Sequence, residues 1–210
     1  MAEDSLFDFL ASGGPVMIPI GLASVLGLAA FIERLWALRV GRIVPREVQV
    51  EVLELARQGR WDDARTLCRK RDTAMSRIFE TALENRERSR RVIKEMTEEI
   101  GRREAAELER NSGIVGIVAS VAPLLGLLGT VWGMIVTFDV IQDQGVGVVS
   151  SLAGGISAAL ITTFTGLSVG IPALIGHRFL LSKVDDLLLD LEEGTLSLLE
   201  ILESSRGGSA

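Results

Sequence analysis

The 210-residue chain contains a single cysteine, Cys68, and a single histidine, His177. One cysteine cannot form an intramolecular disulfide, and one cysteine with one distant histidine cannot supply the ligands of a zinc site. The chain also lacks a basic excess, since its formal net charge is −6, so a nucleic-acid partner is not expected. These absences predict no disulfide framework, no metal site and no cofactor, and a single cysteine is compatible with a reducing compartment.

Ionisable side chains are missing from three long stretches of the chain. Phe9–Ile32, Asn111–Phe138 and Gln144–Gly176 contain no Asp, Glu, Lys or Arg, although 24% of all residues are charged. Each stretch is longer than the roughly 20 residues that a helix needs to cross a bilayer. The sequence therefore predicts an all-α integral membrane protein with three transmembrane helices.

Basic residues predict how these helices are oriented. Nineteen of the 22 Lys and Arg residues lie between Arg34 and Arg110, and the other three follow Gly176. Basic residues beside membrane helices stay on the cytoplasmic side, so the N-terminus is expected outside and the C-terminus inside. The acidic start Met1–Asp8 does not resemble the basic n-region of a cleaved signal peptide, so the first helix is expected to be retained.

These patterns divide the chain into eight predicted segments. In chain order they are an N-terminus on the outer side (1–15), transmembrane helix 1 (16–38), a cytoplasmic helical segment (39–110), transmembrane helix 2 (111–138), a short turn on the outer side (139–146), transmembrane helix 3 (147–176), a cytoplasmic C-terminal helix (177–204) and a disordered tail (205–210).

Within the first span, Pro19 requires either a kink or a helix that starts nearer Met17. Trp36 lies between Arg34 and Arg39 and is typical of an aromatic anchor at the inner headgroup level.

The cytoplasmic segment has its own helical pattern. Glu47–Gln58 and Trp61–Arg71 predict two short helices separated at Gly59. From Thr73, acids and bases alternate at three- and four-residue spacings, which predicts a solvated helix that could run unbroken to Phe138 as a rod of about 99 Å at ~1.5 Å per residue. In the C-terminal helix, apolar residues form a stripe that must pack on the rod or on another copy.

Small and weakly polar residues share one face of each of the last two spans. On the second span they repeat at helical spacing as Gly126, Thr130, Gly133 and Thr137, and on the third as Gly155, Ala159, Thr163, Gly166 and Gly170. Such stripes let membrane helices approach closely, and threonine hydroxyls can bond to their own helix. The concentration of hydroxyls in the third span also fits the lining of a wet path, so both interpretations remain open.

Two motifs carry a resemblance to a known family. They are Ala-Pro-Leu-Leu-Gly-Leu-Leu-Gly-Thr-Val-Trp-Gly-Met (Ala122–Met134) and the segment Gly155–Ala173, which contains Ile-Ser-Ala-Ala-Leu-Ile-Thr-Thr-Phe-Thr-Gly-Leu. With Glu33-Arg34 at the end of the first span and Gly59-Arg60-Trp61-Asp62-Asp63-Ala64, the chain resembles the MotA/TolQ/ExbB proton-channel family.

The resemblance implies a non-enzymatic subunit of a proton-driven motor in the bacterial inner membrane. It implies a homopentamer whose second and third helices surround the single-span helices of an ExbD/TolR-like partner, and that partner's membrane Asp carries the proton. Thr130 and Thr163 match the family's pore threonines, and Pro123 and Pro172 match its pore-region prolines. We expect Thr137, Gly133, Ala159 and Gly166, on the same faces, and Thr162, beside the face of the third span, to line the channel as well.

One position departs from the family pattern. Ton- and Tol-type members have a glutamate in Gly-Ile-Ala-Glu-Ala-Leu, where this chain has Ala158. A carboxylate relay from this subunit is therefore not expected, and the chemistry left to it is hydrogen bonding by hydroxyls around a partner's Asp.

Three other interpretations compete with a channel subunit. A membrane scaffold would hold partner helices without conducting, and a self-sufficient channel would need a membrane carboxylate that this chain lacks. Gly166-Leu167-Ser168-Val169-Gly170 matches a serine-hydrolase elbow in letters only, because that motif requires a strand, a turn and a helix.

Overall fold

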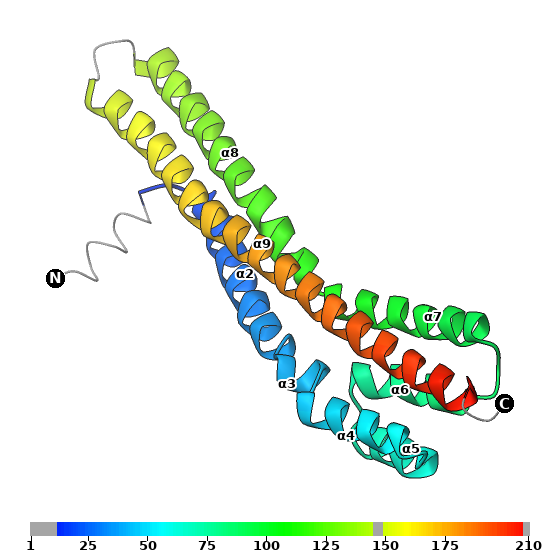
Figure 1. Cartoon of the computed structure of the whole chain (residues 1–210). Coiled ribbons are helices and arrows are strands. Elements are labelled where there is room, and N and C mark those ends of the chain that lie inside the picture. Colours follow the sequence, from blue (N-terminus) through cyan, green and yellow to red (C-terminus); the bar gives the residue numbers. More distant parts are fainter. Residues whose placement is uncertain (1–11, 145–148, 208–210) are drawn as a thin grey trace. The chain divides into compact units, whose positions relative to one another are not determined.

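The computed structural model describes residues 12–144 and 149–207, and every regular element in these residues is an α-helix. The helices are α2 (Met17–Ala37), α3 (Val40–Ile43), α4 (Arg46–Arg57), α5 (Trp61–Lys70), α6 (Ala74–Glu84), α7 (Arg90–Glu109), α8 (Ser112–Gln144) and α9 (Val149–Gly207) (Figure 1). The prediction of an all-helical chain is confirmed.

Contacts divide the chain into two compact units. The first, which we call the membrane unit, comprises the described residues up to Glu33 and those within Asn111–Phe179. The second, which we call the polar unit, comprises Arg34–Arg110 and the residues from Leu180 onward. Helix α9 contributes its first part to the membrane unit and its second part to the polar unit.

The membrane unit contains the predicted spans. α2, α8 and the part of α9 that begins at Ala153 are long and apolar enough to cross a bilayer. Their large apolar side chains point outward, as Leu22 at 61% and Leu160 at 65% exposure illustrate, which suits a lipid environment. Because α2 starts at Met17, Pro19 lies in its first turn, where the missing N–H leaves no helical hydrogen bond unmade.

In the polar unit, α4 and α5 form the predicted hairpin. Gly59 joins them with φ of 73°, a left-handed conformation that favours glycine. The core of this unit consists of large side chains that are almost completely buried, among them Phe79, Met75, Leu83, Ile93, Leu187 and Leu198. The stripe predicted on the C-terminal helix thus packs within the same chain.

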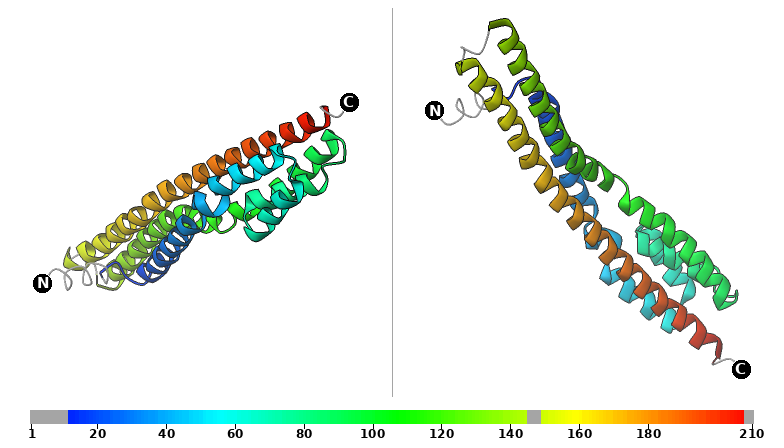
Figure 2. Two further views of the ribbon diagram at one scale, coloured as in Figure 1. Left: turned by 60° about the horizontal axis from the view of Figure 1, so that its bottom comes forward. Right: turned by 90° about the horizontal axis from the view of Figure 1, so that it is seen from above.

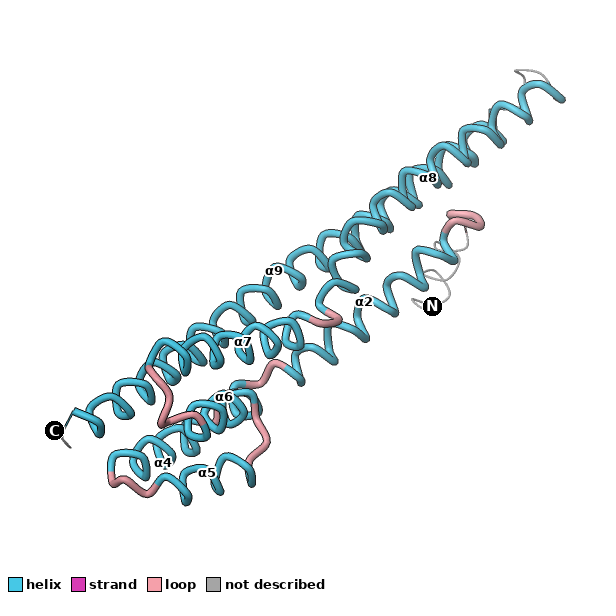
Figure 3. The backbone as a smooth tube through the Cα atoms, turned by 90° about the vertical axis from the view of Figure 1, so that its right-hand side faces the viewer, coloured by secondary structure: helices cyan, strands magenta, loops and turns pink. Residues whose placement is uncertain are grey.

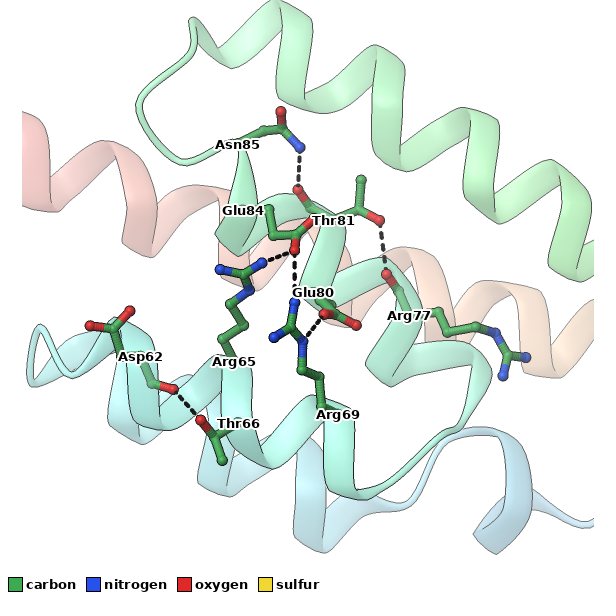
Figure 4. A network of polar contacts seen from close by, with 9 residues as sticks. All are labelled: Asp62, Arg65, Thr66, Arg69, Arg77, Glu80, Thr81, Glu84 and Asn85. Atoms are coloured by element: carbon green, nitrogen blue, oxygen red, sulfur yellow. Dashed lines mark hydrogen bonds and ion pairs between the residues drawn. The ribbon is translucent and has the colours of Figure 1, made fainter.

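Ion pairs hold α5 against α6 on the surface of the polar unit (Figure 4). Arg69 pairs with Glu80 and Glu84, and Arg65 pairs with Glu84. Beneath these surface ion pairs, the buried face of α5, which includes Ala64 and Cys68, also stabilises the contact.

The unbroken rod predicted over 73–138 is wrong, because the chain leaves the helical path twice. α6 ends at Glu84, where Asn85 donates its side-chain amide to the Thr81 carbonyl, and α7 begins only at Arg90. The second break is at Asn111, whose φ of 65° is left-handed, a conformation that asparagine tolerates better than most residues.

Two predicted boundaries also change. α8 continues to Gln144, so residues 139–144 of the predicted turn are helical, and residues 145–148 lie outside the described part of the chain. α9 continues to Gly207, and Arg206 donates a hydrogen bond to the Arg88 carbonyl, so residues 205–207 of the predicted disordered tail are helical. The remaining tail residues, and residues 1–11, lie outside the described part.

Candidate channel-forming site

The two predicted small-residue stripes face each other within one chain. Figures 2 and 3 show α8 and the first part of α9 side by side over their length. A Cβ atom added at Gly166 would lie 2.6 Å from the Ala122 carbonyl oxygen, and one added at Gly126 would lie 3.0 Å from the Thr162 carbonyl oxygen. We call this contact the α8–α9 seam. Backbone meets backbone in the seam, so only residues without a side chain fit at these positions.

The seam extends in both directions from this point. A Cβ at Gly129 would collide with Thr162 Oγ1, and one at Gly133 would lie 3.0 Å from Ala159 Cβ. Near the C-terminal end of α8 and the N-terminal end of α9, Gly155 leaves space for the Thr137 side chain. Gly129 was not among the predicted residues, but it also belongs to the seam, since it lies three residues after Gly126 and four before Gly133 and so shares their face of α8.

Several residues predicted to line a channel therefore lie inside the seam. Thr137 is 3% exposed, Thr162 is fully buried, and Ala159, Gly133 and Gly166 are buried. In a single chain these residues join two helices of the same subunit. Their role in lining a channel stays a prediction.

Thr130 and Thr163, the residues that match the family's pore threonines, are half-buried. Thr163 donates its hydroxyl to the Gly126 carbonyl across the seam at 3.2 Å, and Thr130 donates to the Leu127 carbonyl in its own helix at 2.6 Å. Gly126 is one turn before Thr130, so the structure brings the two threonines to the same region of the helix pair. Ala158, at the family's glutamate position, is also half-buried.

The hydroxyls of the seam have the same bonding pattern. Thr137 donates to the Gly133 carbonyl at 2.7 Å, and Thr162 donates to the Ala159 carbonyl at 2.8 Å. A hydroxyl has one proton to donate and two lone pairs that accept. Because each proton is committed to a backbone carbonyl, what remains available at these hydroxyls is hydrogen-bond acceptance.

The two prolines lie on different faces. Pro123, inside α8, packs in the seam, since a Cβ at Gly170 would lie 2.6 Å from its Cγ. Pro172, inside α9, instead lines a cleft of about 290 Å³ next to α2, together with Ser24, Gly27 and Phe31. The same cleft contains Ser168, and residues 166–170 are helical throughout, so the strand and turn of a hydrolase elbow are not present at this motif.

His177 closes the seam at the end opposite Thr137. Its Nδ1 lies 3.0 Å from the Ser112 carbonyl oxygen, and its ring covers Gly116, where a Cβ would lie 2.9 Å from Nε2. This contact was not predicted, because the partner of His177 is a backbone carbonyl. Gly116, which lies opposite the ring, could have indicated the contact only if the pairing of α8 with α9 had been known.

The chemistry of the site follows from what these helices supply. The charge-free parts of α8 and α9 offer hydroxyl lone pairs and carbonyl oxygens but no carboxylate. The described residues also contain no group of three or more His, Cys, Asp or Glu side chains that could hold a metal ion. The charge-free parts can therefore accept hydrogen bonds from a protonated group, but they supply no carboxylate that could bind a proton and release it.

The fold and this site define a multi-pass, all-helical membrane protein with two helices joined through glycines. The pattern of the MotA/TolQ/ExbB proton channel family matches residues 70–193, which is more than half of the chain, and the chain belongs to this family. The match includes the seam and much of the polar unit.

Individual relatives agree with this assignment. A putative biopolymer transport protein ExbB-like 1 from Synechocystis is 35% identical over 182 residues, which cover 84% of this chain and 71% of the relative. Biopolymer transport protein ExbB from Aquifex aeolicus is 43% identical over 86 residues, covering 41% of this chain and 58% of the relative. The Tol-Pal system protein TolQ from Haemophilus influenzae is 37% identical over 83 residues, covering 40% of this chain and 36% of the relative.

Proposed function

We propose that this chain is the channel-forming subunit of a motor in the bacterial inner membrane that converts the proton motive force into mechanical work on the cell envelope. The polar unit lies in the cytoplasm and the chain's N-terminus lies outside. Five copies surround the membrane helices of an ExbD/TolR-like single-span protein. The relatives named for biopolymer transport and for the Tol-Pal system support work of this kind.

The observation that carries the proposal is a polar helix pair whose stretch around Thr130 and Thr163 contains no carboxylate. Thr130 and Thr163 lie within one turn of each other along the pair, and both have committed their protons to carbonyls. A lone pair of such a hydroxyl can accept a hydrogen bond from a neutral carboxylic acid. It cannot donate to a carboxylate without first breaking its backbone bond. These threonines thus favour the protonated form of a partner's Asp over its ionised form.

This preference gives the motor its two states. An ionised Asp in the low dielectric of the membrane is costly unless it is solvated or paired, so it must leave the threonines when it loses its proton. Each proton that crosses ~100 mV releases about 2.3 kcal/mol, which is available for that movement. Ala158, in place of the family's glutamate, leaves the proton-carrying role to the partner.

A Thr163→Val variant tests the function directly. The complex is isolated from native membranes through a tag on this chain and reconstituted into vesicles with a proton gradient. Valine keeps the shape but removes the acceptor, so we expect proton flux to fall at least tenfold while the complex assembles normally. Thr165→Val is the matched control, because among the described residues the Thr165 hydroxyl bonds to the Ile161 carbonyl of its own helix and not across the seam.

A non-conducting scaffold is the alternative, and the buried seam supports it, because the hydroxyls of Thr137, Thr162 and Thr163 already have carbonyl partners within the chain. Unchanged flux and unchanged envelope work in the Thr163→Val complex would favour the scaffold. Proton flux through this chain reconstituted without its partner would instead indicate a self-sufficient channel.

A further inference from the structure

Four arginines follow one another at the end of the first membrane helix without an intervening acid. Between Glu33 and Glu47 the chain contains Arg34, Arg39, Arg42 and Arg46 and no Asp or Glu. The segment begins in the last turn of α2, which is the end of the first candidate span. Its net charge of +4 is therefore concentrated directly beside the bilayer.

Three of these arginines are available for binding. Arg39, Arg42 and Arg46 are exposed, and among the described residues no carboxylate forms an ion pair with any of them. Some exposed arginines of the polar unit differ in this respect: Arg57, Arg91 and Arg103 pair with acids one turn away. Arg34 is only 8% exposed, so it does not contribute to the accessible surface.

An aromatic side chain orders one of these exposed guanidinium groups. The guanidinium carbon of Arg39 lies 5.2 Å from the centre of the Trp36 ring, within the range of a cation–π interaction. Trp36 itself is 61% exposed, although it is a large side chain at the end of a membrane helix. An exposed tryptophan at this position prefers the headgroup layer, where its ring meets apolar chains and its N–H meets polar groups.

Phosphate chemistry fits this surface. A guanidinium group donates two parallel hydrogen bonds to phosphate oxygens, and stacking on Trp36 limits the conformations that Arg39 must give up on binding. Basic residues near a membrane attract anionic lipids, whereas a zwitterionic headgroup offers a phosphate but no net charge. Three exposed arginines without a paired carboxylate favour the anionic headgroup.

We propose that Trp36, Arg39, Arg42 and Arg46 form a binding surface for the headgroups of anionic phospholipids in the leaflet that faces the polar unit. The proposal does not depend on proton conduction. It gives the motor a second anchor in the membrane, beside the apolar faces of its spanning helices.

The test compares lipids retained by the assembled complex. The tagged complex is placed in nanodiscs of phosphatidylglycerol and phosphatidylcholine in equal amounts, and the lipids that remain after mild delipidation are counted by mass spectrometry. We expect wild type to be enriched in phosphatidylglycerol and the Arg39→Gln/Arg42→Gln/Arg46→Gln variant to lose at least tenfold of this preference, since each basic residue contributes about fivefold.

A second triple variant has the same net charge and serves as the control. Arg57→Gln/Arg91→Gln/Arg103→Gln removes three exposed charges elsewhere in the polar unit and is expected to keep the wild-type preference. Trp36→Leu keeps all arginines but removes the ring, and we expect a loss of a few-fold. Equal retention of both lipids by wild type overturns the proposal, as does an equal loss of preference in the two triple variants.

Discussion

The membrane unit and the polar unit differ in how the helices within each of them pack. In the membrane unit, α8 meets α9 through glycines and backbone atoms, and the large apolar side chains point outward. In the polar unit, the large apolar side chains point inward, and ion pairs join neighbouring helices at the surface.

The difference reflects the solvent of each unit. Lipid is as apolar as leucine, so burying leucine between membrane helices gains little, and close backbone contact with internal hydrogen bonds stabilises the pair instead. Water drives leucine and phenylalanine into a core, and it solvates the charged side chains that remain outside. The same chain follows both rules along α9, whose first part presents Gly155, Gly166 and Gly170 and whose second part presents Leu187 and Leu198.

The largest effect is expected from adding a side chain to the seam. At Gly166, a Cβ would meet the Ala122 carbonyl oxygen at 2.6 Å and Gly126 Cα at 2.9 Å, and neither backbone atom can rotate away. Gly166→Val should cost about 3 kcal/mol, the upper part of the range for overpacking. The loss of stability is measured by heating the complex and then determining by size-exclusion chromatography how much of it stays intact. Gly154→Val is the control, because a Cβ there meets nothing within 4 Å; an equal loss in both variants would argue against the seam.

A smaller effect is expected from removing a charge in the polar unit. Arg77 binds Glu104 through two hydrogen bonds of 2.7 and 2.6 Å, and Glu104 is 10% exposed. This carboxylate, ahead of Asp72, raises the pKa of Arg77. Because the Arg77 side chain is 41% exposed, we expect Glu104→Gln to cost about 2 kcal/mol, less than breaking a fully buried pair.

Hydrogen exchange of the α6 and α7 amides reports this loss locally. Glu99→Gln provides the comparison, since its pair with Arg103 is exposed on both sides and should contribute about 0.5 kcal/mol or less. A cost for Glu104→Gln no greater than that of the control would mean that the partly buried Arg77–Glu104 pair stabilises the polar unit no more than an exposed pair does.

The smallest effect depends on pH and concerns Cys68, which is 2% exposed. Burial, and secondarily the carboxylate of Glu80, raise the pKa of this thiol from 9.0 to about 12. The folded state therefore holds the thiol proton more tightly than the unfolded chain. Its contribution to stability is complete below pH 9 and is lost as the pH rises from 9 toward 12.

The Cys68→Ala variant isolates this contribution. The stability difference between wild type and the variant should be constant from about pH 6 to 8 and should shrink by about pH 10.5, as measured by urea unfolding of the helical signal. A thiol that reacts with iodoacetamide at about pH 8 as fast as a free cysteine would show that the site is open to water.

The absence of charge predicted the membrane spans well, because lipid tolerates few alternatives to an apolar helix. The hairpin around Gly59 was equally predictable, since a glycine separates two amphipathic patterns. The breaks at Asn85 and Asn111 could not be predicted from the sequence. The charge pattern favours a helix on both sides of each break and carries no information on how neighbouring helices pack.

The residues of the seam were predictable as a close helix contact, but the helix that each of them contacts was not. Stripes such as Gly126–Gly133 and Gly155–Gly166 indicate close helix contact without indicating which helix is the partner. The structure shows that the partner is the same chain. The contact of His177 with the Ser112 carbonyl has no sequence signature, since every residue carries a carbonyl.

The seam also determines which movements the membrane unit allows. Where backbone atoms of α8 and α9 already touch, as at Gly166 and Ala122, there is no layer of side chains that could slide or change rotamer. α8 and the first part of α9 must therefore turn and tilt together as one rigid body. In the complex proposed above, any rotation would then take place between subunits, at the exposed faces that carry Phe164 and Trp132, and not between α8 and α9 of one subunit.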